Sequence, residues 1–206
     1  FGRRAINVPH IGHCDCYVVH FKSKRSLLEA NPCHLNHSKE QGIIEQLKAQ
    51  VAGGWGSTIQ RGSEATLLII EMIERRLATG QPMILMGDFN NNITDGVLSH
   101  LLTNNLSFVP SIKGNSYLAK YCLHDSWDLY QAGIADEPSD KHKKPKGIRS
   151  PTHYFAGSSS VFDYILLSCE FNASYQDSLY QVSAYDTYER HLINPIFERD
   201  GESTDH

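Results

Sequence analysis

The segment between residues 61 and 87 constrains the fold of this chain more than any other. Apolar residues recur at helical spacing over residues 61–78, and Gly80 and Pro82 close that pattern. A continuous apolar run follows at residues 83–86 and ends at Gly87. Such a run between a proline and a glycine predicts a short strand that is buried on both faces. The helix and the strand together predict an α/β (α+β) layered domain.

Weaker patterns complete this outline. Residues 5–8 and 16–21 are typical of short strands joined by a turn near Gly12. Residues 39–51 have helical periodicity, and the run Gly53-Gly54-Trp55-Gly56 is expected to interrupt that helix. We further expect a helix at 96–102, a surface loop at 135–150, a second buried strand at 161–168 and a third at 180–184.

Composition limits the classes of function. The chain has 206 residues, 40% of them apolar, and a net charge of −4, so we expect residues 1–206 to form a single folded domain. The longest apolar runs are far shorter than the roughly 20 residues of a membrane span. The negative charge argues against holding nucleic acid by bulk charge alone, but it allows an enzyme that binds a few phosphates with placed cations and a metal. The five cysteines have irregular spacing, which predicts no disulfide framework and favours a reducing compartment such as the cytoplasm.

The sharpest chemical motif is Gly87-Asp88-Phe89-Asn90, directly after the apolar run. Residues two apart on an extended segment share a face, so Asp88 and Asn90 are expected to point at one small site. Oxygen ligands of this kind suit Mg²⁺ or Mn²⁺. The alternative is an Asp/Asn turn that caps the strand end.

Two further motifs carry titratable groups at strand ends. His20 ends an apolar stretch and is followed by Lys22, Lys24 and Arg25, which could bind a phosphate backbone. Asp163 lies in an otherwise apolar strand, where a buried carboxylate needs a partner such as a histidine. The alternatives are a solvated basic turn after His20 and a surface carboxylate at the entry of the second strand.

The chain also contains a neighbouring acid and imidazole, Asp205 and His206, which could supply a metal ligand and a general base. In this order the motifs resemble the endonuclease/exonuclease/phosphatase superfamily. The resemblance depends on His20-Phe21-Lys22-Ser23-Lys24, residues 61–68, Gly87-Asp88-Phe89-Asn90, residues 162–166 and residues 203–206.

This resemblance implies a four-layer α/β sandwich of two packed mixed sheets flanked by helices. Relative to that fold the chain is expected to be a C-terminal two-thirds fragment, incomplete at both ends, without the first strands and the last strand. The implied activity is Mg²⁺- or Mn²⁺-dependent hydrolysis of a phosphate ester by a nuclease-like enzyme, with nucleic acid as the expected substrate.

The same resemblance implies roles for single residues. Asp88 and Asn90 would position or activate the attacking water and bind the phosphate, and Asp88 and Asp205 would bind the metal. His206 would be the catalytic histidine, oriented by Asp163, and His20 would contact the phosphate. Substrate binding would fall to the basic residues Lys22, Lys24 and Arg25.

Three alternatives stay open. The substrate could be a phosphorylated lipid or inositol instead of nucleic acid. A zinc-binding module could use the cysteines and histidines near the start of the chain: His10, His13, Cys14, Cys16, Cys33, His34 and His37. A non-catalytic nucleic-acid-binding module could use the basic patch at residues 141–146. The oligomeric state cannot be inferred from these patterns.

Overall fold

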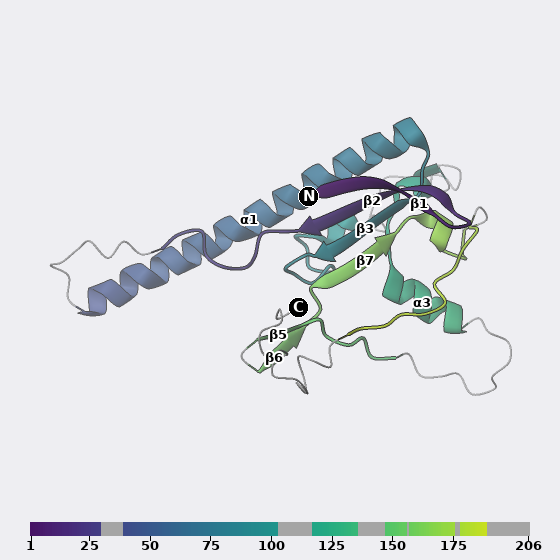
Figure 1. Cartoon of the computed structure of the whole chain (residues 1–206). Helices are drawn as coiled ribbons and strands as arrows, with labels where there is room; N and C mark the ends of the chain where they lie inside the picture. The colour runs from purple at the N-terminus through teal and green to yellow at the C-terminus, as the bar shows by residue number, and fades with distance from the viewer. Residues whose placement is uncertain (30–38, 103–116, 136–146, 156, 176–177, 189–206) are drawn as a thin grey trace.

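The computed structural model describes residues 1–29, 39–102, 117–135, 147–155, 157–175 and 178–188 (Figure 1). Its strands are β1 (Gly2–Val8), β2 (Gly12–His20), β3 (Met83–Asp88), β4 (His124–Asp125), β5 (His153–Phe155), β6 (Ser158–Ser160) and β7 (Asp163–Leu167). Its α-helices are α1 (Lys39–Thr79) and α3 (Ser126–Ala135). Short 3-10 turns are η1 (Ser99–Leu101), η3 (Ala119–Tyr121) and η4 (Cys169–Phe171).

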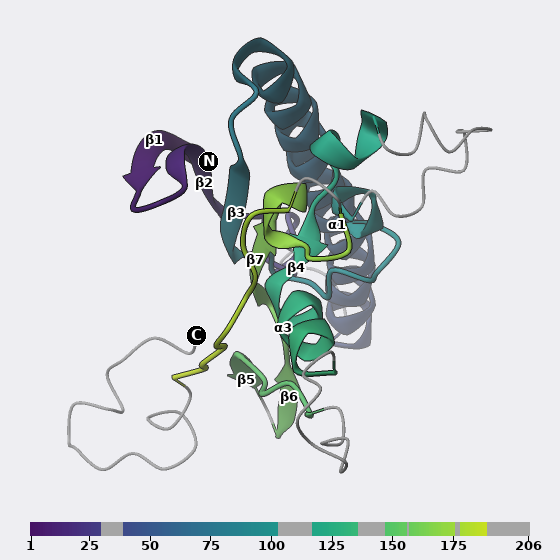
Figure 2. The ribbon, with the colours of Figure 1, turned by 90° about the vertical axis from the view of Figure 1, so that its right-hand side faces the viewer.

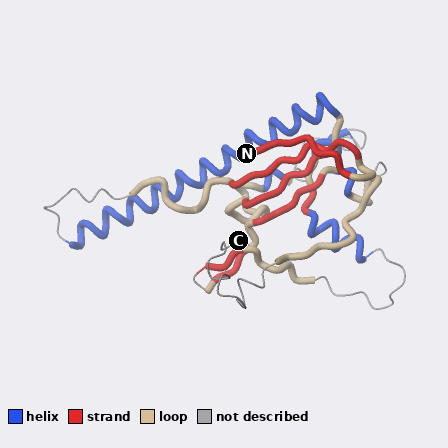
Figure 3. Tube along the Cα trace, viewed as in Figure 1, coloured by secondary structure: helices blue, strands red, loops and turns tan. Residues whose placement is uncertain are grey.

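Five strands form one mixed sheet in the order β1-β2-β3-β7-β4 (Figure 3). β2 and β3 are parallel and are connected through α1, whereas the other neighbours are antiparallel. β5 and β6 form a separate two-stranded hairpin. The mixed helix and strand content agrees with the expected α+β class. The part of the chain that the structure describes contains one large sheet, so the four-layer sandwich is not confirmed.

β3 lies where the apolar run predicted a strand, but its burial differs from the prediction. Met83 and Leu85 are almost completely buried, at 1% and 0% exposure, whereas Ile84 and Met86 are only partly buried. The reason is that α1 covers only one face of the sheet, as Figure 2 shows for β3 and β7. Expecting burial on both faces was therefore wrong for the described residues.

The glycine-rich run does not interrupt the helix, because α1 is continuous from Lys39 to Thr79. Because Gly53 has no side chain, residues 26–28 can pack directly against the helix. A Cβ on Gly53 would lie 1.9 Å from the Ser26 hydroxyl oxygen and 2.5 Å from the Leu28 backbone nitrogen. The Leu27 backbone N–H donates to the Gly53 carbonyl at 3.1 Å. Close packing at Gly53 thus offsets the roughly 1 kcal/mol that a helical glycine costs relative to alanine.

The core forms where the C-terminal half of α1 meets the sheet. Three aromatic rings pack edge-on within it, with centroid distances of 5.3 Å for Phe21–Phe89 and 5.4 Å for Phe89–Tyr164. The helix contributes Ala65, Leu68, Ile69 and Met72, and the strands contribute Tyr17, Val19, Met83, Leu85, Tyr164 and Leu166. This core sets the position of β2, β3 and β7, whose ends carry the motifs selected from the sequence.

Other expectations had mixed outcomes. The strand pair near Gly12 is confirmed as β1 and β2, and the strand at 161–168 is confirmed as β7. The helix expected at 96–102 is reduced to the 3-10 turn η1. Residues 180–184 are not in a strand, because no neighbouring strand pairs with them in the described part of the chain. Most of the loop expected at 135–150 lies outside the described residues.

A buried ion pair connects the end of α1 to η4. Arg76, which is 6% exposed, bonds Glu170, and the Ser168 hydroxyl donates to the same carboxylate at 2.6 Å. Burial opposes the charge of Glu170, but the hydrogen bonds from Ser168 and Arg76 outweigh it and lower the pKa of Glu170 below its ordinary 4.5. Glu170 is therefore ionised in the folded protein at neutral pH, and it is paired with Arg76 in that state.

This lowered pKa predicts acid-dependent stability. A carboxylate with a depressed folded pKa stabilises the fold fully above its unfolded pKa, and this contribution is lost as the pH falls through the folded value. Glu170→Gln is expected to lower the free energy of unfolding by about 1.5–3 kcal/mol at pH 7. Urea unfolding at several pH values should show that the difference between the variant and the wild type narrows below pH 4.5. A difference that stays constant down to the lowest pH would contradict this role of Glu170.

Candidate functional site

Three of the side chains selected from the sequence lie in one row across adjacent strands. His20 ends β2, Asp88 ends β3 and Asp163 begins β7. The strand register pairs His20 with Asp88, and Asp88 with Asp163. Register partners point to the same face of a sheet on strands about 4.8 Å apart. Because Leu85 and Tyr164 face α1, alternation places this polar row on the opposite face.

The carboxylate of Asp88 is held at the centre of the polar row. Its Oδ1 accepts a hydrogen bond from the Asn90 backbone N–H at 2.7 Å, and its Oδ2 accepts one from Asn90 Nδ2 at 2.9 Å. His20 Nε2 lies 3.3 Å from Asp88 Oδ2. The His20 side chain is 75% exposed and that of Asp88 only 11%. The row therefore combines a largely buried carboxylate, held by two hydrogen bonds, with a solvent-exposed imidazole.

Asn90 contacts Asp88 from a turn, and the two residues do not lie on one extended segment as expected. It lies beyond β3 in a turn with φ of +50°, and its Nδ2 also donates to the Phe21 carbonyl at 3.0 Å. The Asp/Asn turn at the strand end, which was the alternative interpretation, is thus present. Asn90 is 8% exposed, so it orients Asp88 from within the protein.

Asp163 is partly exposed, because the outer face of the sheet is open at this position. The expectation that Asp163 is buried within an apolar strand was therefore wrong. The alternative, an accessible carboxylate at the entry of the strand, is correct. The Thr152 hydroxyl accepts hydrogen bonds from the backbone N–H groups of Phe162 and Asp163, both at 3.0 Å. Thr152 thereby fixes where β7 begins and how Asp163 enters the polar row.

Among the basic residues after His20, Lys24 packs against an aromatic ring beside the start of β7. Its amine is 4.8 Å from the centroid of the Phe162 ring, next to Asp163 in the chain. Burial and the neighbouring charge of Arg61 lower the pKa of Lys24. The Lys22 amine instead bonds within its own loop, to Ser23 and to the Arg25 carbonyl at 3.3 Å. The structure therefore does not bring Lys22 to the row, and Arg25 is an exposed residue of the same loop.

Two residues near the row were missed by the sequence analysis. The His153 ring stacks on Phe162 at a centroid distance of 4.9 Å. Arg149 bonds the Asp125 carboxylate, donates to the Tyr185 hydroxyl at 2.9 Å, and lies 4.6 Å from the Tyr164 ring centroid. A lone arginine in a Pro-, Gly- and Lys-rich stretch has no sequence signal that distinguishes it from the lysines of that stretch.

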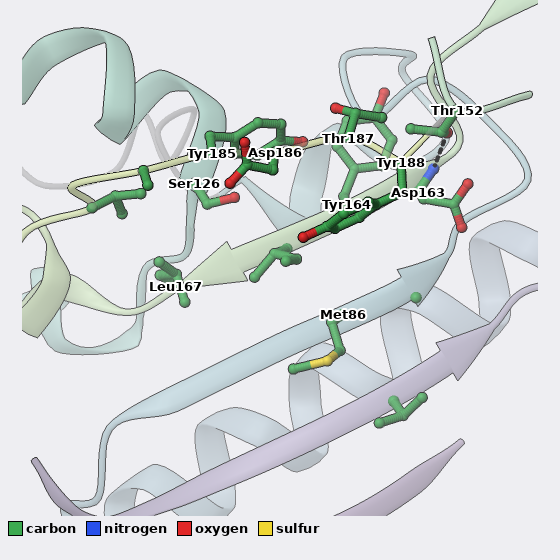
Figure 4. A pocket seen from close by; sticks show the side chains of 15 residues that line it. Met86, Ser126, Thr152, Asp163, Tyr164, Leu167, Tyr185, Asp186, Thr187 and Tyr188 are labelled. Atoms are coloured by element: carbon green, nitrogen blue, oxygen red, sulfur yellow. Dashed lines mark hydrogen bonds between the residues drawn. The ribbon is translucent and has the colours of Figure 1, made fainter. Parts of the chain in front are cut away.

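A groove of about 740 Å³ adjoins the polar row on the same face of the sheet (Figure 4). Its floor includes Val18, Met86 and Ile165, which are register partners one step along the strands from the row. The segment 182–188 forms its outer wall, with Tyr185 and Tyr188 (Figure 4). A polar edge thus borders a largely apolar surface.

The expected metal sites find limited support in the geometry. Asp88 and Asp163 bring two carboxylates to one edge, but the described residues contain no group of three or more His, Cys, Asp or Glu that could hold a metal ion. These residues therefore do not form a complete Mg²⁺ site by themselves. Asp205 and His206 lie outside the described residues, so their expected roles stay predictions.

The described residues do not support the alternative of a zinc-binding module near the start of the chain. Cys14 and Cys16 are buried free thiols in β2, and burial raises the pKa of both. A raised pKa disfavours the thiolate that zinc requires. Cys33, His34 and His37 are outside the part of the chain that is described.

No helix among the described residues is long and apolar enough to cross a membrane. Comparison with known proteins adds no assignment: the chain matches no protein-family model, no curated protein and no solved structure. The function is therefore argued from the geometry of the polar row and from the motifs in the sequence.

Proposed function

We propose that this protein is a metal-dependent phosphoesterase, and that it is a nuclease-like enzyme that hydrolyses phosphodiester bonds. The observation that carries this proposal is the polar row, in which His20, Asp88 and Asp163 are register neighbours on one face. Carboxylate and imidazole side chains at hydrogen-bonding distance are suited to general acid–base catalysis. The motif resemblance to the endonuclease/exonuclease/phosphatase superfamily supports the same reaction class.

In this proposal Asp88 positions the attacking water, since Asn90 holds its carboxylate by two hydrogen bonds. His20, which is largely exposed, contacts the phosphate by donating a hydrogen bond from its imidazole to a phosphoryl oxygen. Lys24, whose amine lies over the Phe162 ring, contributes positive charge that stabilises the negative charge developing on the phosphate. A bound divalent cation would supply Lewis acidity at the phosphoryl group.

The groove favours a second class of substrate, a phosphorylated lipid, for the same hydrolysis of a phosphodiester bond. Its floor is apolar and begins one register step from the row, so it could hold the apolar part of a phosphorylated lipid. The residues that line it include acidic side chains, Asp163 and Asp186, and no lysine or arginine among those described. A lipid phosphodiester is therefore the alternative to nucleic acid.

The test is hydrolysis of plasmid DNA, of bis-p-nitrophenyl phosphate and of a phosphatidylcholine vesicle by the purified chain. Each substrate is incubated with Mg²⁺, with Mn²⁺ and with EDTA. We expect hydrolysis of the generic phosphodiester and of DNA with either metal, and none with EDTA. Hydrolysis of the vesicle alone would select the lipid alternative, and activity that survives EDTA would refute metal dependence.

Lys24→Gln is expected to raise KM for DNA about tenfold and to weaken the salt dependence of binding, because one phosphate contact is lost. The matched control is Lys120→Gln, an exposed lysine of η3. Steady-state kinetics at two salt concentrations check this prediction. An equal effect of both variants would show that Lys24 has no special position at the site.

A further inference from the structure

The basic loop after β2, residues 22–25, is held against α1 by three side chains of the helix. Ser57, Arg61 and Glu64 are spaced by four and three residues, so they lie on one face of α1. The Ser57 hydroxyl donates to the Arg25 carbonyl at 2.5 Å, and Arg61 Nη1 donates to the Lys22 carbonyl at 2.9 Å. Glu64 Oε2 accepts a hydrogen bond from the Lys22 backbone N–H at 2.7 Å. These three side chains, which we call the α1 clamp, fix the loop backbone at both of its ends.

The α1 clamp determines where the Lys24 side chain lies. Lys24 is inside the clamped loop, and its amine is 4.8 Å from the centroid of the Phe162 ring at the entry of β7. Ser57 and Arg61 are buried, at 0% and 3% exposure, so the loop cannot leave the helix without leaving buried polar groups unpaired. The position of the Lys24 amine therefore depends on α1 as well as on the aromatic ring.

Arg61 also brings a positive charge to this loop. Among the described residues neither Arg61 nor Lys24 forms an ion pair, and Arg61 Nε is buried without a hydrogen-bond partner. The carboxylates of Asp95 and Glu64 raise the pKa of Arg61, although burial lowers it more. The charge of Arg61 in turn acts with burial to lower the pKa of Lys24. Two cations that repel each other without a paired carboxylate favour the binding of an anion.

We propose that Arg61 is a positioning residue for the phosphate group of the substrate. It fixes the loop that carries Lys24, and its charge adds to the positive potential that a phosphate on Lys24 meets. Arg61 is buried, so it acts through Lys24 and does not touch the substrate. A neutral donor would satisfy the Lys22 carbonyl equally well, which leaves the guanidinium charge to be explained by the anion. This inference rests on the phosphate-binding role of Lys24 in the proposed function.

The test is the binding of a labelled single-stranded DNA oligonucleotide, followed by fluorescence anisotropy in EDTA at several salt concentrations. EDTA separates binding from metal-dependent turnover. Arg61→Met keeps an apolar stem but removes the charge and the donors, and it is expected to raise Kd about tenfold and to lower the salt slope by about one. Arg61→Lys keeps the charge and is expected to keep the slope. Arg61→Met combined with Lys24→Gln should bind no more weakly than either single variant, because both remove the same phosphate contact.

The matched control is Arg76→Met, which removes another buried arginine of α1, 6% exposed and paired with Glu170. It is expected to lower Tm while the Kd for DNA and the salt slope stay at the wild-type values. Ser57→Ala removes one hydrogen bond of the α1 clamp without adding volume, and it is expected to raise Kd about threefold. This variant keeps the test decisive if Arg61→Met does not fold.

Three results overturn the role of Arg61. They are a wild type that does not bind the oligonucleotide, unchanged binding in Arg61→Met and Ser57→Ala, and a loss in the double variant that equals the product of the two single losses. Hydrolysis of bis-p-nitrophenyl phosphate with Mg²⁺ is measured separately. A chain that shows the expected binding pattern without hydrolysis would refute the phosphoesterase and retain the phosphate-binding role of Lys24 and Arg61.

Discussion

Asp88→Asn is expected to lower the phosphodiesterase turnover by about 10²–10⁴-fold, the usual contribution of a positioned acid–base group. The substitution keeps the shape of the side chain, but it removes the negative charge that faces His20 and one of the two oxygens that accept hydrogen bonds from Asn90. Turnover is measured on bis-p-nitrophenyl phosphate at saturating Mg²⁺, with Tm as the check on folding. Asp163→Asn is expected to act in the same direction, because its carboxylate is the register neighbour of Asp88.

The matched control is Asp128→Asn, which changes an exposed carboxylate in the first turn of α3, outside the row. It should keep wild-type turnover. If Asp88→Asn and Asp163→Asn both retained near-normal turnover with unchanged stability, the polar row would not be the active site. A loss of turnover that follows a loss of stability would instead assign a structural role to these carboxylates.

Gly87→Ala is expected to destabilise the fold by about 2–6 kcal/mol, which combines backbone strain with overpacking. Gly87 has φ of +136°, a conformation that L side chains rarely adopt. A Cβ at this position would lie 2.0 Å from the Val19 carbonyl oxygen of the neighbouring strand. The backbone of β3 would have to move away from β2 just before Asp88. Urea unfolding followed by circular dichroism measures the effect.

Gly96→Ala serves as the control for this prediction. An added Cβ at Gly96 meets nothing within 4 Å, and its φ is not in the left-handed region. This variant should therefore change the free energy of unfolding by less than about 1 kcal/mol. Equal stability of Gly87→Ala and Gly96→Ala would show that β3 and β2 can separate at Gly87 without cost.

Local sequence patterns were sufficient to locate β1, β2, β3 and β7 and the half of α1 that packs on the sheet. The apolar run before Gly87 predicted β3, and the helical periodicity of residues 61–78 predicted the half of α1 that packs on the sheet. His20, Asp88 and Asp163 were selected because each lies at or within an apolar strand, where an imidazole or a carboxylate can serve a site or needs a partner. Each of these inferences depends on interactions within one segment or on its periodicity.

The tertiary structure decided what such patterns do not contain. The glycine-rich run stays helical because residues 26–28 pack against Gly53, a contact between segments that are distant in the sequence. Asp163 is partly exposed because α1 covers only the other face of the sheet, and Arg149 is held by Asp125 and Tyr185. The polar row itself exists because strand register sets His20, Asp88 and Asp163 side by side. Residue type and spacing determine which groups a strand end carries, whereas register between strands determines which of them meet.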